Sequence, residues 1–327
     1  VCSSTYSAID LINPISVLTN TKPELKKSLH LFFKLSSLKE EIKEWLNTSQ
    51  VPSQALNKLS EWTDGEIRDW DISRDAPYFG FQIPGTTDKY FYVWLDAPVG
   101  YMAATQQYCT DHDCGFDDIW KNGGYEIHHF IGKDIMYFHT LFWPAMLMVS
   151  GFSLPTKINV HGFLTVGGEK MSKSRGTFVL ARDFAEHINP EALRYYYAAK
   201  LSDRVEDMDL NIEDFVLRVN ADVVNKFVNI GSRLASIVHK KCNGLLSEPD
   251  STGLALLQEC HAAISQIDAY YENLQYNKAM TDIMRLADLA NKYINDTAPW
   301  DVAKTNVDAA RQLCTTGLNA LKLLAIL

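Results

Sequence analysis

The chain has 327 residues, of which 46% are hydrophobic, so it can build two or three packed units and is not disordered throughout. Its formal net charge of −9 argues against binding to nucleic acid through overall charge, although a local basic groove stays compatible with it. No apolar run approaches the roughly 20 residues needed to cross a bilayer, which predicts a soluble protein.

The six cysteines are scattered along the chain without paired spacing. They are Cys2, Cys109, Cys114, Cys242, Cys260 and Cys314. This pattern is typical of reduced thiols in a cytoplasmic protein rather than of a disulfide framework. Cys109 and Cys114 stand five apart in a loop-like stretch with His112, but a metal site there would need two further ligands at finger-like spacing.

The first half of the chain predicts mixed α/β structure. We expect helices over Leu38–Leu46 and, past Pro52, over Gln54–Trp70. From Tyr78 onward, short and nearly continuous apolar runs predict strands buried on both faces of a parallel sheet. These runs cover residues 90–95, 127–131 and 158–160. A helix over Asp134–Val149 lies between the last two runs, which predicts a βαβ unit.

After Lys200, apolar residues recur three and four apart, which is typical of amphipathic helices. We expect a bundle of helices over residues 215–238, 254–274, 279–294 and 307–327. Asp207, Asp209 and Asn211 begin like a calcium loop, but Ile212 stands at the position of the required glycine, so we interpret them as a solvated acidic turn. Val1 is not an initiator residue and the last segment lacks a cap, so we expect more chain on both sides.

The stretch from Gly167 to Gly176 is a loop rich in glycine, serine and positive charge. Its glycines allow the backbone to close over an anion, and its lysines supply mobile positive charges, which suits a polyphosphate ligand. The spacing does not match a Walker P-loop. Taken alone, such a cluster is ordinarily a solvated basic turn.

Several longer stretches resemble one enzyme family. The sequence Lys170-Met-Ser-Lys-Ser174 resembles the KMSKS motif of class I aminoacyl-tRNA synthetases, and it stands after a parallel-sheet pattern and before a helix bundle, as in that class. The stretches at 71–80, 92–101 and 129–144 resemble the methionine enzymes. The resemblance implies the second half of a Rossmann-like nucleotide-binding fold with part of an inserted connective domain, followed by an all-α anticodon-binding helix bundle.

The resemblance divides the chain into four domains. It implies the remainder of the inserted connective and zinc-knuckle domain at 1–75, the second half of the Rossmann-like catalytic domain at 76–163, the KMSKS and stem-contact region at 164–215, and the anticodon-binding domain at 216–327. The implied activity is that of a methionine–tRNA ligase, which activates L-methionine with ATP and Mg²⁺ and charges tRNA(Met), initiator tRNA included, in the cytoplasm. The HIGH motif and the first half of the nucleotide fold are not in these residues, so we expect the chain alone to be inactive.

The residues that match functional positions of the family fall into four sets and one lone ligand. The catalytic set is Lys173, which would stabilise the leaving pyrophosphate, with Lys170 and Ser172 shaping the loop. The ATP set is Lys173, Gly132, Asp134, His161 and Leu164. The methionine set is Trp94, Ala97, Pro98, Tyr101, Ile135, His139 and Trp143. The anticodon set is Asn229, Arg233 and Trp300. Cys2 matches the last ligand of a zinc knuckle whose other ligands are not in these residues, so Zn²⁺ would need the full-length protein.

Each of these assignments has a plainer alternative. Trp94, Trp143 and Trp300 are ordinary packing residues in the alternative interpretation, His139 is a hydrogen-bonded structural histidine, and Asp134 is a helix N-cap. For the chain as a whole, the alternatives are one half of a split synthetase and a non-catalytic tRNA-binding module that uses only the bundle.

Overall fold

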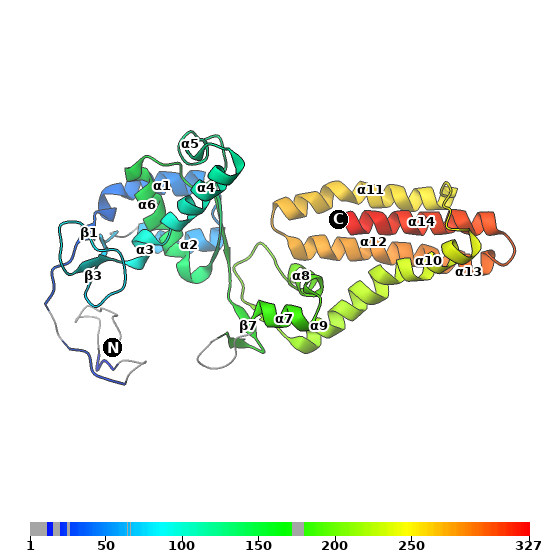
Figure 1. The fold of residues 1–327 in the computed structure, drawn as a ribbon, viewed down its shortest axis with the longest axis horizontal. Helices are drawn as coiled ribbons and strands as arrows, with labels where there is room; N and C mark the ends of the chain where they lie inside the picture. The colour runs from blue at the N-terminus through cyan, green and yellow to red at the C-terminus, as the bar shows by residue number, and fades with distance from the viewer. Residues whose placement is uncertain (1–11, 16–19, 25–26, 64, 66, 172–179) are drawn as a thin grey trace. The chain divides into compact units, whose positions relative to one another are not determined.

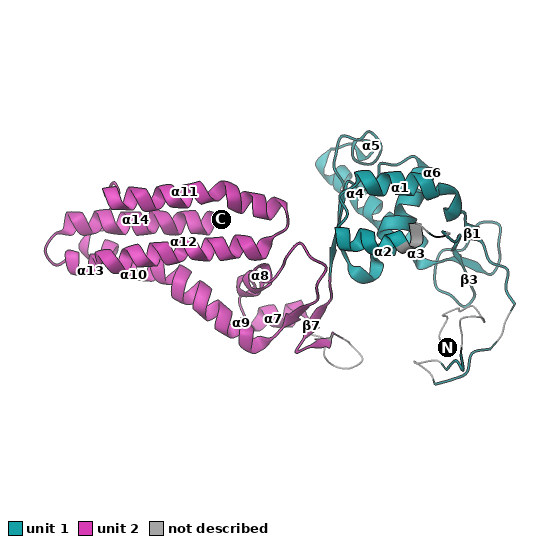
Figure 2. Ribbon diagram, turned by 180° about the vertical axis from the view of Figure 1, so that it is seen from behind, with its two compact units in different colours: residues 1–161 teal, residues 162–327 magenta. Residues whose placement is uncertain are grey.

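The computed structural model describes residues 12–15, 20–24, 27–63, 65, 67–171 and 180–327. The chain forms two compact units, Val1–His161 and Gly162–Leu327, which are coloured separately in Figure 2. No helix in the described ranges is long and apolar enough to cross a membrane.

Unit 1 combines short strand pairs with helices (Figure 1). Its elements, in chain order, are β1 Phe32–Phe33, η2 Leu35–Leu38, α1 Lys39–Thr48, α2 Ser53–Thr63, β2 Trp70–Asp71, β3 Ser73–Asp75, β4 Lys89–Phe91, α3 Val93–Asp96, α4 Val99–His112, α5 Phe116–Trp120, β5 His128–Gly132, η3 Lys133–Ile135, η4 Phe138–Phe142, α6 Trp143–Ser150 and β6 Lys157–His161. The helix predicted over 38–46 corresponds to α1, whose buried Ile42, Trp45 and Leu46 follow the three-and-four spacing of one helix face.

The predicted βαβ unit is present. Strands β5 and β6 pair in parallel with Gly132 opposite His161, and the chain between them forms η3, η4 and α6. The prediction that these strands are buried on both faces is wrong for β5. Its burial alternates, with His129 and Ile131 buried and Phe130 63% exposed, because only one face of this strand packs on the helices.

Two other predicted elements of unit 1 end early. The helix predicted over 54–70 stops at Thr63, because Trp70 is taken up by strand β2, where it pairs with Phe33. The strand predicted over 90–95 stops at Phe91, and the chain turns into the short helix α3. The apolar run is the same for either conformation, so pattern alone could not locate this turn.

Unit 2 has a small sheet followed by helices. Its elements, in chain order, are β7 Leu164–Val166, β8 Glu169–Lys170, α7 Ala181–His187, α8 Pro190–Ala198, β9 Met208–Leu210, α9 Ile212–Arg218, η5 Val219–Val228, α10 Asn229–Lys241, α11 Ser251–Glu272, α12 Tyr276–Thr297, α13 Pro299–Val302 and α14 Val307–Ile326. The sheet has the order β8-β7-β9, with β7 antiparallel to β8 and parallel to β9.

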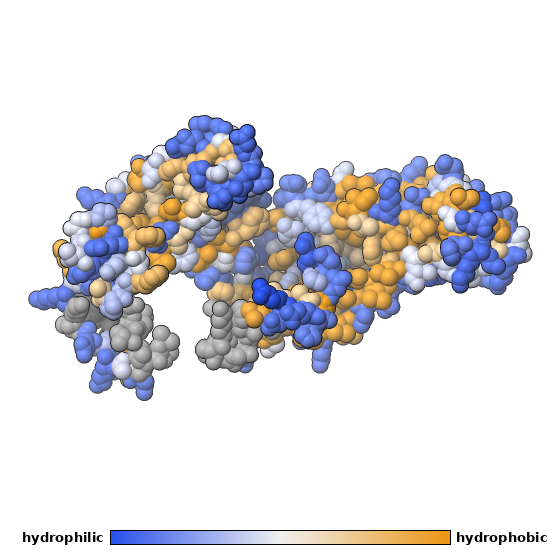
Figure 3. Space-filling view, in the orientation of Figure 1, coloured by the Kyte–Doolittle hydropathy of each residue, from blue (hydrophilic) through white to orange (hydrophobic). Residues whose placement is uncertain are grey.

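The predicted helix bundle is confirmed in the second half of unit 2 (Figure 1). The helix expected over 215–238 is one continuous helical segment in which α9, the π-helical η5 and α10 follow each other. Helices α10, α11, α12 and α14 share one core that includes Leu234, Ile267, Leu286 and Cys314. On the face shown in Figure 3, hydrophilic residues predominate at the end of the bundle near α13.

Candidate functional site

Four residues of the predicted methionine set meet in one aromatic cluster of unit 1. Trp94 lies on α3, Tyr101 on α4, His139 in the π-helical turn η4 and Trp143 at the start of α6. The His139 ring centroid is 6.2 Å from that of Trp94 and 5.8 Å from that of Tyr101. The Tyr101 and Trp143 rings are 6.3 Å apart. We call these four residues, with His129 described below, the aromatic cluster.

Hydrogen bonds determine the protonation of His139. Its Nδ1 is 3.0 Å from the carbonyl oxygen of Ile135, which can only accept, so Nδ1 carries the proton. Nε2 is then an acceptor, and the Tyr101 hydroxyl donates to it at 2.8 Å. Burial lowers the pKa of His139, because the interior disfavours the charged imidazolium. His139 is therefore a neutral, oriented ring at neutral pH.

The cluster contains a second buried histidine, His129 on β5, which was not predicted as a site residue. Its Nε2 accepts a hydrogen bond of 3.2 Å from the indole Nε1 of Trp143. Its ring centroid is 4.9 Å from that of Tyr101 and 5.5 Å from that of His139. Burial, with a smaller contribution from His139, lowers the pKa of His129 to about 4. One signal in the sequence could have indicated His129. It stands two residues before Ile131, so both lie on the same face of the strand, and a buried histidine needs a polar partner.

The π-helical turn arranges the wall of the cluster. The backbone N–H of Trp143 donates to the carbonyl of Phe138, five residues back, as in a π-helix. Phe138 and His139 both contact Trp94. The Phe138 ring stacks on the Trp94 indole at 4.4 Å and 12°. Trp94 and Phe138 thus form a partly exposed aromatic wall beside His139, which is buried and uncharged.

The other three residues of the methionine set lie at element ends. Ala97 is exposed at the end of α3, whereas Pro98 is buried at the N-cap of α4. Ile135 ends η3 and contributes its carbonyl to His139. A cluster with aromatic rings, hydroxyl and neutral imidazole suits a polarizable thioether, for which sulfur–aromatic contacts contribute about 0.3 to 1.5 kcal/mol.

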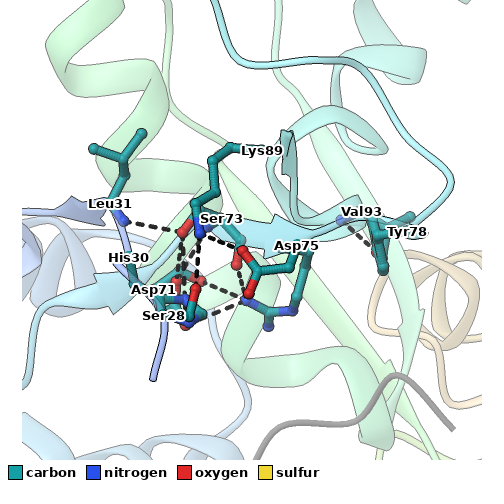
Figure 4. A network of polar contacts seen from close by, with 10 residues as sticks. Ser28, His30, Leu31, Asp71, Ser73, Asp75, Tyr78, Lys89 and Val93 are labelled. Carbon is teal, nitrogen blue, oxygen red and sulfur yellow. Dashed lines mark hydrogen bonds and ion pairs between the residues drawn. The ribbon is translucent and has the colours of Figure 1, made fainter. Parts of the chain in front are cut away.

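A polar network holds the β3–β4 hairpin, and a separate hydrogen bond between Tyr78 and Val93 reaches the start of α3 (Figure 4). Buried Ser73 accepts a hydrogen bond of 2.9 Å from the backbone N–H of Leu31, and Lys89 is ion-paired with Asp75 across the β3–β4 hairpin. The Tyr78 hydroxyl accepts from the N–H of Val93 at 3.2 Å, at the first residue of α3. These contacts connect the hairpin to the helix that carries Trp94.

Arg74, on the same hairpin, is held by polar contacts and by an aromatic ring. It donates to the carbonyl of Ser73 at 2.7 Å and lies 3.4 Å from the carboxylate of Asp71. The guanidinium carbon is 4.0 Å from the centroid of the Tyr92 ring. Its side chain is only 16% exposed, so this cation is oriented by its neighbours.

An apolar cavity of about 390 Å³ lies in unit 1, and Trp143 forms part of its wall. Its walls come mainly from α4 and α6 and include Met102, Phe116 and Met146. No charged side chain lines it, so it offers nothing to hold phosphate.

Three residues of the predicted ATP set share the carboxyl edge of the β5–β6 pair. Gly132 ends β5 opposite His161, and a Cβ on Gly132 would lie 2.8 Å from an oxygen of Asp134. In open α/β sheets this edge is where ligands bind. The alternative of Asp134 as an N-cap is wrong, because Asp134 lies inside η3 and Gly132 occupies the cap. Leu164 belongs to unit 2, on β7.

The catalytic set falls mostly outside the described residues. Ser172 and Lys173 lie there entirely, and Lys170 is described only through its backbone in β8. The turn before it uses Gly167 and Gly168 at φ of 58° and 79°, a conformation that favours glycine.

Asp209 fastens this hairpin turn to the neighbouring strand. Its carboxylate accepts from the Thr165 hydroxyl at 2.6 Å and from the Gly168 N–H at 2.8 Å, and these bonds lower its pKa. The interpretation of residues 207–211 as a solvated acidic turn is therefore wrong. Met208–Leu210 is strand β9, because these residues pair with β7.

The anticodon set is partly assembled in unit 2. The Arg233 guanidinium lies 4.6 Å from the centroid of the Trp300 ring, and Trp300 is 37% exposed. Asn229 lies one turn before Arg233 on α10. Asn295, which was not predicted, accepts from Arg233 at 2.7 Å. No pattern in the sequence indicated Asn295 as a site residue, because the helix break at Pro299 separates it from Trp300.

The predicted zinc ligand Cys2 lies outside the described residues. Within the ranges that are described, no group of three or more His, Cys, Asp or Glu residues is arranged to hold a metal ion.

Comparison with known proteins gives consistent matches over both units. Residues 1–235 match the family model "tRNA synthetases class I (M)", and residues 247–327 match "Anticodon binding domain of methionyl tRNA ligase". A methionine–tRNA ligase of Thiobacillus denitrificans is 51% identical over 100% of this chain and 48% of its own length. The chain thus spans about half the length of that curated relative.

Solved structures from Mycobacterium tuberculosis are similar to this chain. Methionyl-tRNA synthetase in complex with methionyl-adenylate superposes with a TM-score of 0.81 at 28% identity, and the apo form with 0.78 at 26% identity. Each match covers 95% of this chain and 62% of the other.

Proposed function

Because this chain belongs to the methionyl-tRNA synthetases of class I, we propose that its protein activates L-methionine with ATP and transfers it to tRNA(Met). The observation that carries the proposal is the aromatic cluster. Its histidines are buried and their pKa values are lowered, so it presents rings and one hydroxyl but no charge. Such a surface favours a neutral thioether side chain and disfavours charged amino acids, whose desolvation is not compensated there.

In the first step, a carboxylate oxygen of methionine attacks the α-phosphorus of ATP and pyrophosphate leaves. The chain's own contribution is to position reactants and to neutralise the charge that develops. In this proposal Gly132 and Asp134 receive the ribose, His161 and Leu164 border the adenine, and Lys173 stabilises the departing pyrophosphate.

Lys170 and Ser172 shape the loop that carries Lys173. Mg²⁺ bound to ATP would supply positive charge at the phosphates.

In the second step, a ribose hydroxyl of the terminal adenosine of tRNA attacks the methionyl carbonyl and AMP leaves. Trp300, with its partly exposed ring, would stack on an unpaired anticodon base, while Asn229 and Arg233 read base edges. We include initiator tRNA among the substrates and place the reaction in the cytoplasm.

Replacement of Lys173 by alanine in the full-length enzyme tests this function. Lys173 acts on charge in the transition state, so methionine-dependent exchange of pyrophosphate into ATP should fall far more than the affinity for methionine. Lys121→Ala is the matched control, because Lys121 is an exposed lysine paired with Asp117. Equal losses in exchange and in methionine affinity would contradict the assignment. No pyrophosphate exchange and no charging by the full-length parent, with tRNA still bound through the bundle, would favour a non-catalytic tRNA-binding module.

A further inference from the structure

Two cysteine thiols meet at the carboxyl end of α4, away from the aromatic cluster. Cys109 lies in the last turn of α4 and is 3% exposed, whereas Cys114 follows the helix and is half-buried. Their Sγ atoms are 2.9 Å apart, with the Cys114 thiol donating to the Cys109 sulfur. A disulfide bond is about 2.0 Å long, so bonding requires the sulfurs to approach by only about 1 Å.

The backbone, rather than a chance rotamer, brings these thiols together. Asp113 ends α4 in the left-handed conformation, at φ of 53°. The N–H of Cys114 then donates to the carbonyl of Cys109 at 3.1 Å, which is the six-to-one hydrogen bond of a Schellman motif. In that motif the side chains of the first and sixth residues normally make an apolar contact, and here both are thiols.

We propose that Cys109 and Cys114 form a reversible intramolecular disulfide when the protein meets a low-molecular-weight disulfide such as oxidised glutathione. The Cys114 thiolate, which is the more exposed, attacks one sulfur of the small disulfide and displaces one small thiol. Cys109 then gives up its proton and attacks the Cys114 sulfur, displacing the second. Two cysteines are oxidised, one small disulfide is reduced, and the two protons leave on the two small thiols.

The environment of each thiol supports this order. The hydrogen bond with Cys114, together with burial, raises the pKa of Cys109 to about 11, so Cys109 is a poor first nucleophile and suits the resolving role. The bundle cysteines Cys242, Cys260 and Cys314 are fully buried and do not reach a small oxidant in the folded chain. The inference does not rest on the proposed enzymatic function.

The test uses the chain with Cys2→Ser as parent, because Cys2 lies outside the described residues and its thiol would complicate the result. After the folded parent has been exposed to oxidised glutathione, its intact mass is measured, and the protein is then unfolded, alkylated and digested so that its peptides can be identified. The expected result is the loss of two alkylatable thiols, a mass lower by two hydrogens and a peptide link between Cys109 and Cys114. A small thiol such as reduced glutathione in excess should restore both.

Two variants then establish the order of attack. Cys109→Ser should stop with one glutathione on Cys114, whereas Cys114→Ser should form no disulfide at all. Cys260→Ser is the control and should behave like the parent. The proposal is overturned if the treated parent, once unfolded, keeps both thiols alkylatable, or if it accumulates glutathione on them without a link.

Discussion

His129 connects the aromatic cluster to the pH dependence of folding. Its Nε2 must stay unprotonated to accept the indole N–H of Trp143. Burial and the nearby His139 lower its pKa to about 4, whereas an exposed histidine titrates near 6.5. Replacing His129 by glutamine keeps an acceptor for Trp143 and removes the titration.

The lowered pKa of His129 makes the free energy of unfolding depend on pH. Because the folded pKa is lowered, the unfolded chain binds more protons between about pH 6.5 and about pH 4. The stability from this group is complete above pH 6.5 and is lost as the pH falls through that window. At about 1.36 kcal/mol per pH unit, the free energy of unfolding should fall by about 2 kcal/mol between pH 6.5 and pH 5.

Urea unfolding at about pH 7.5 and about pH 5 measures this loss. Every tryptophan except Trp300 precedes Gly162, so fluorescence follows unit 1. The free energy of unfolding of His129→Gln should fall by about 2 kcal/mol less than that of the parent between these conditions. His128→Gln, an exposed neighbour on β5, should keep the parent's pH dependence. If His129→Gln also keeps it, the cluster does not depend on a neutral His129 and the reasoning fails.

Three further substitutions test other parts of the chain. Tyr101→Phe removes the donor to His139 and leaves a buried acceptor unsatisfied, so the free energy of unfolding should fall by about 1 to 3 kcal/mol in urea unfolding; an unchanged free energy of unfolding would contradict this hydrogen bond. Gly162→Ala would place a Cβ 2.2 Å from the carbonyl oxygen of Glu206, so the thermal unfolding midpoint should drop, and an unaltered midpoint would contradict the close approach. Trp300→Ala in the full-length enzyme should cost about 1 to 3 kcal/mol in tRNA recognition while sparing pyrophosphate exchange, and normal charging would remove Trp300 from the anticodon site.

The elements that depend on local periodicity were predictable from the amino-acid sequence. The helices of the bundle were predictable because each buries one face, and the spacing of apolar residues records that face directly. The β5–β6 pair was predictable because an intervening helix of suitable length requires a parallel crossover. The family motifs identified Tyr101, His139 and Trp143 as neighbours, and they do lie in one cluster.

The polar contacts between distant segments were not predictable and become visible in the folded chain alone. His129 is paired with Trp143 and Asn295 with Arg233 because separate elements bring them together, and no spacing in the chain records such pairs. Asp209 was predicted to be solvated. The pairing of β9 with β7 instead places its carboxylate against the turn at Gly168, 41 residues earlier in the chain. Periodicity encodes which face of an element is buried, whereas the partner on the other side of that face depends on how the elements pack.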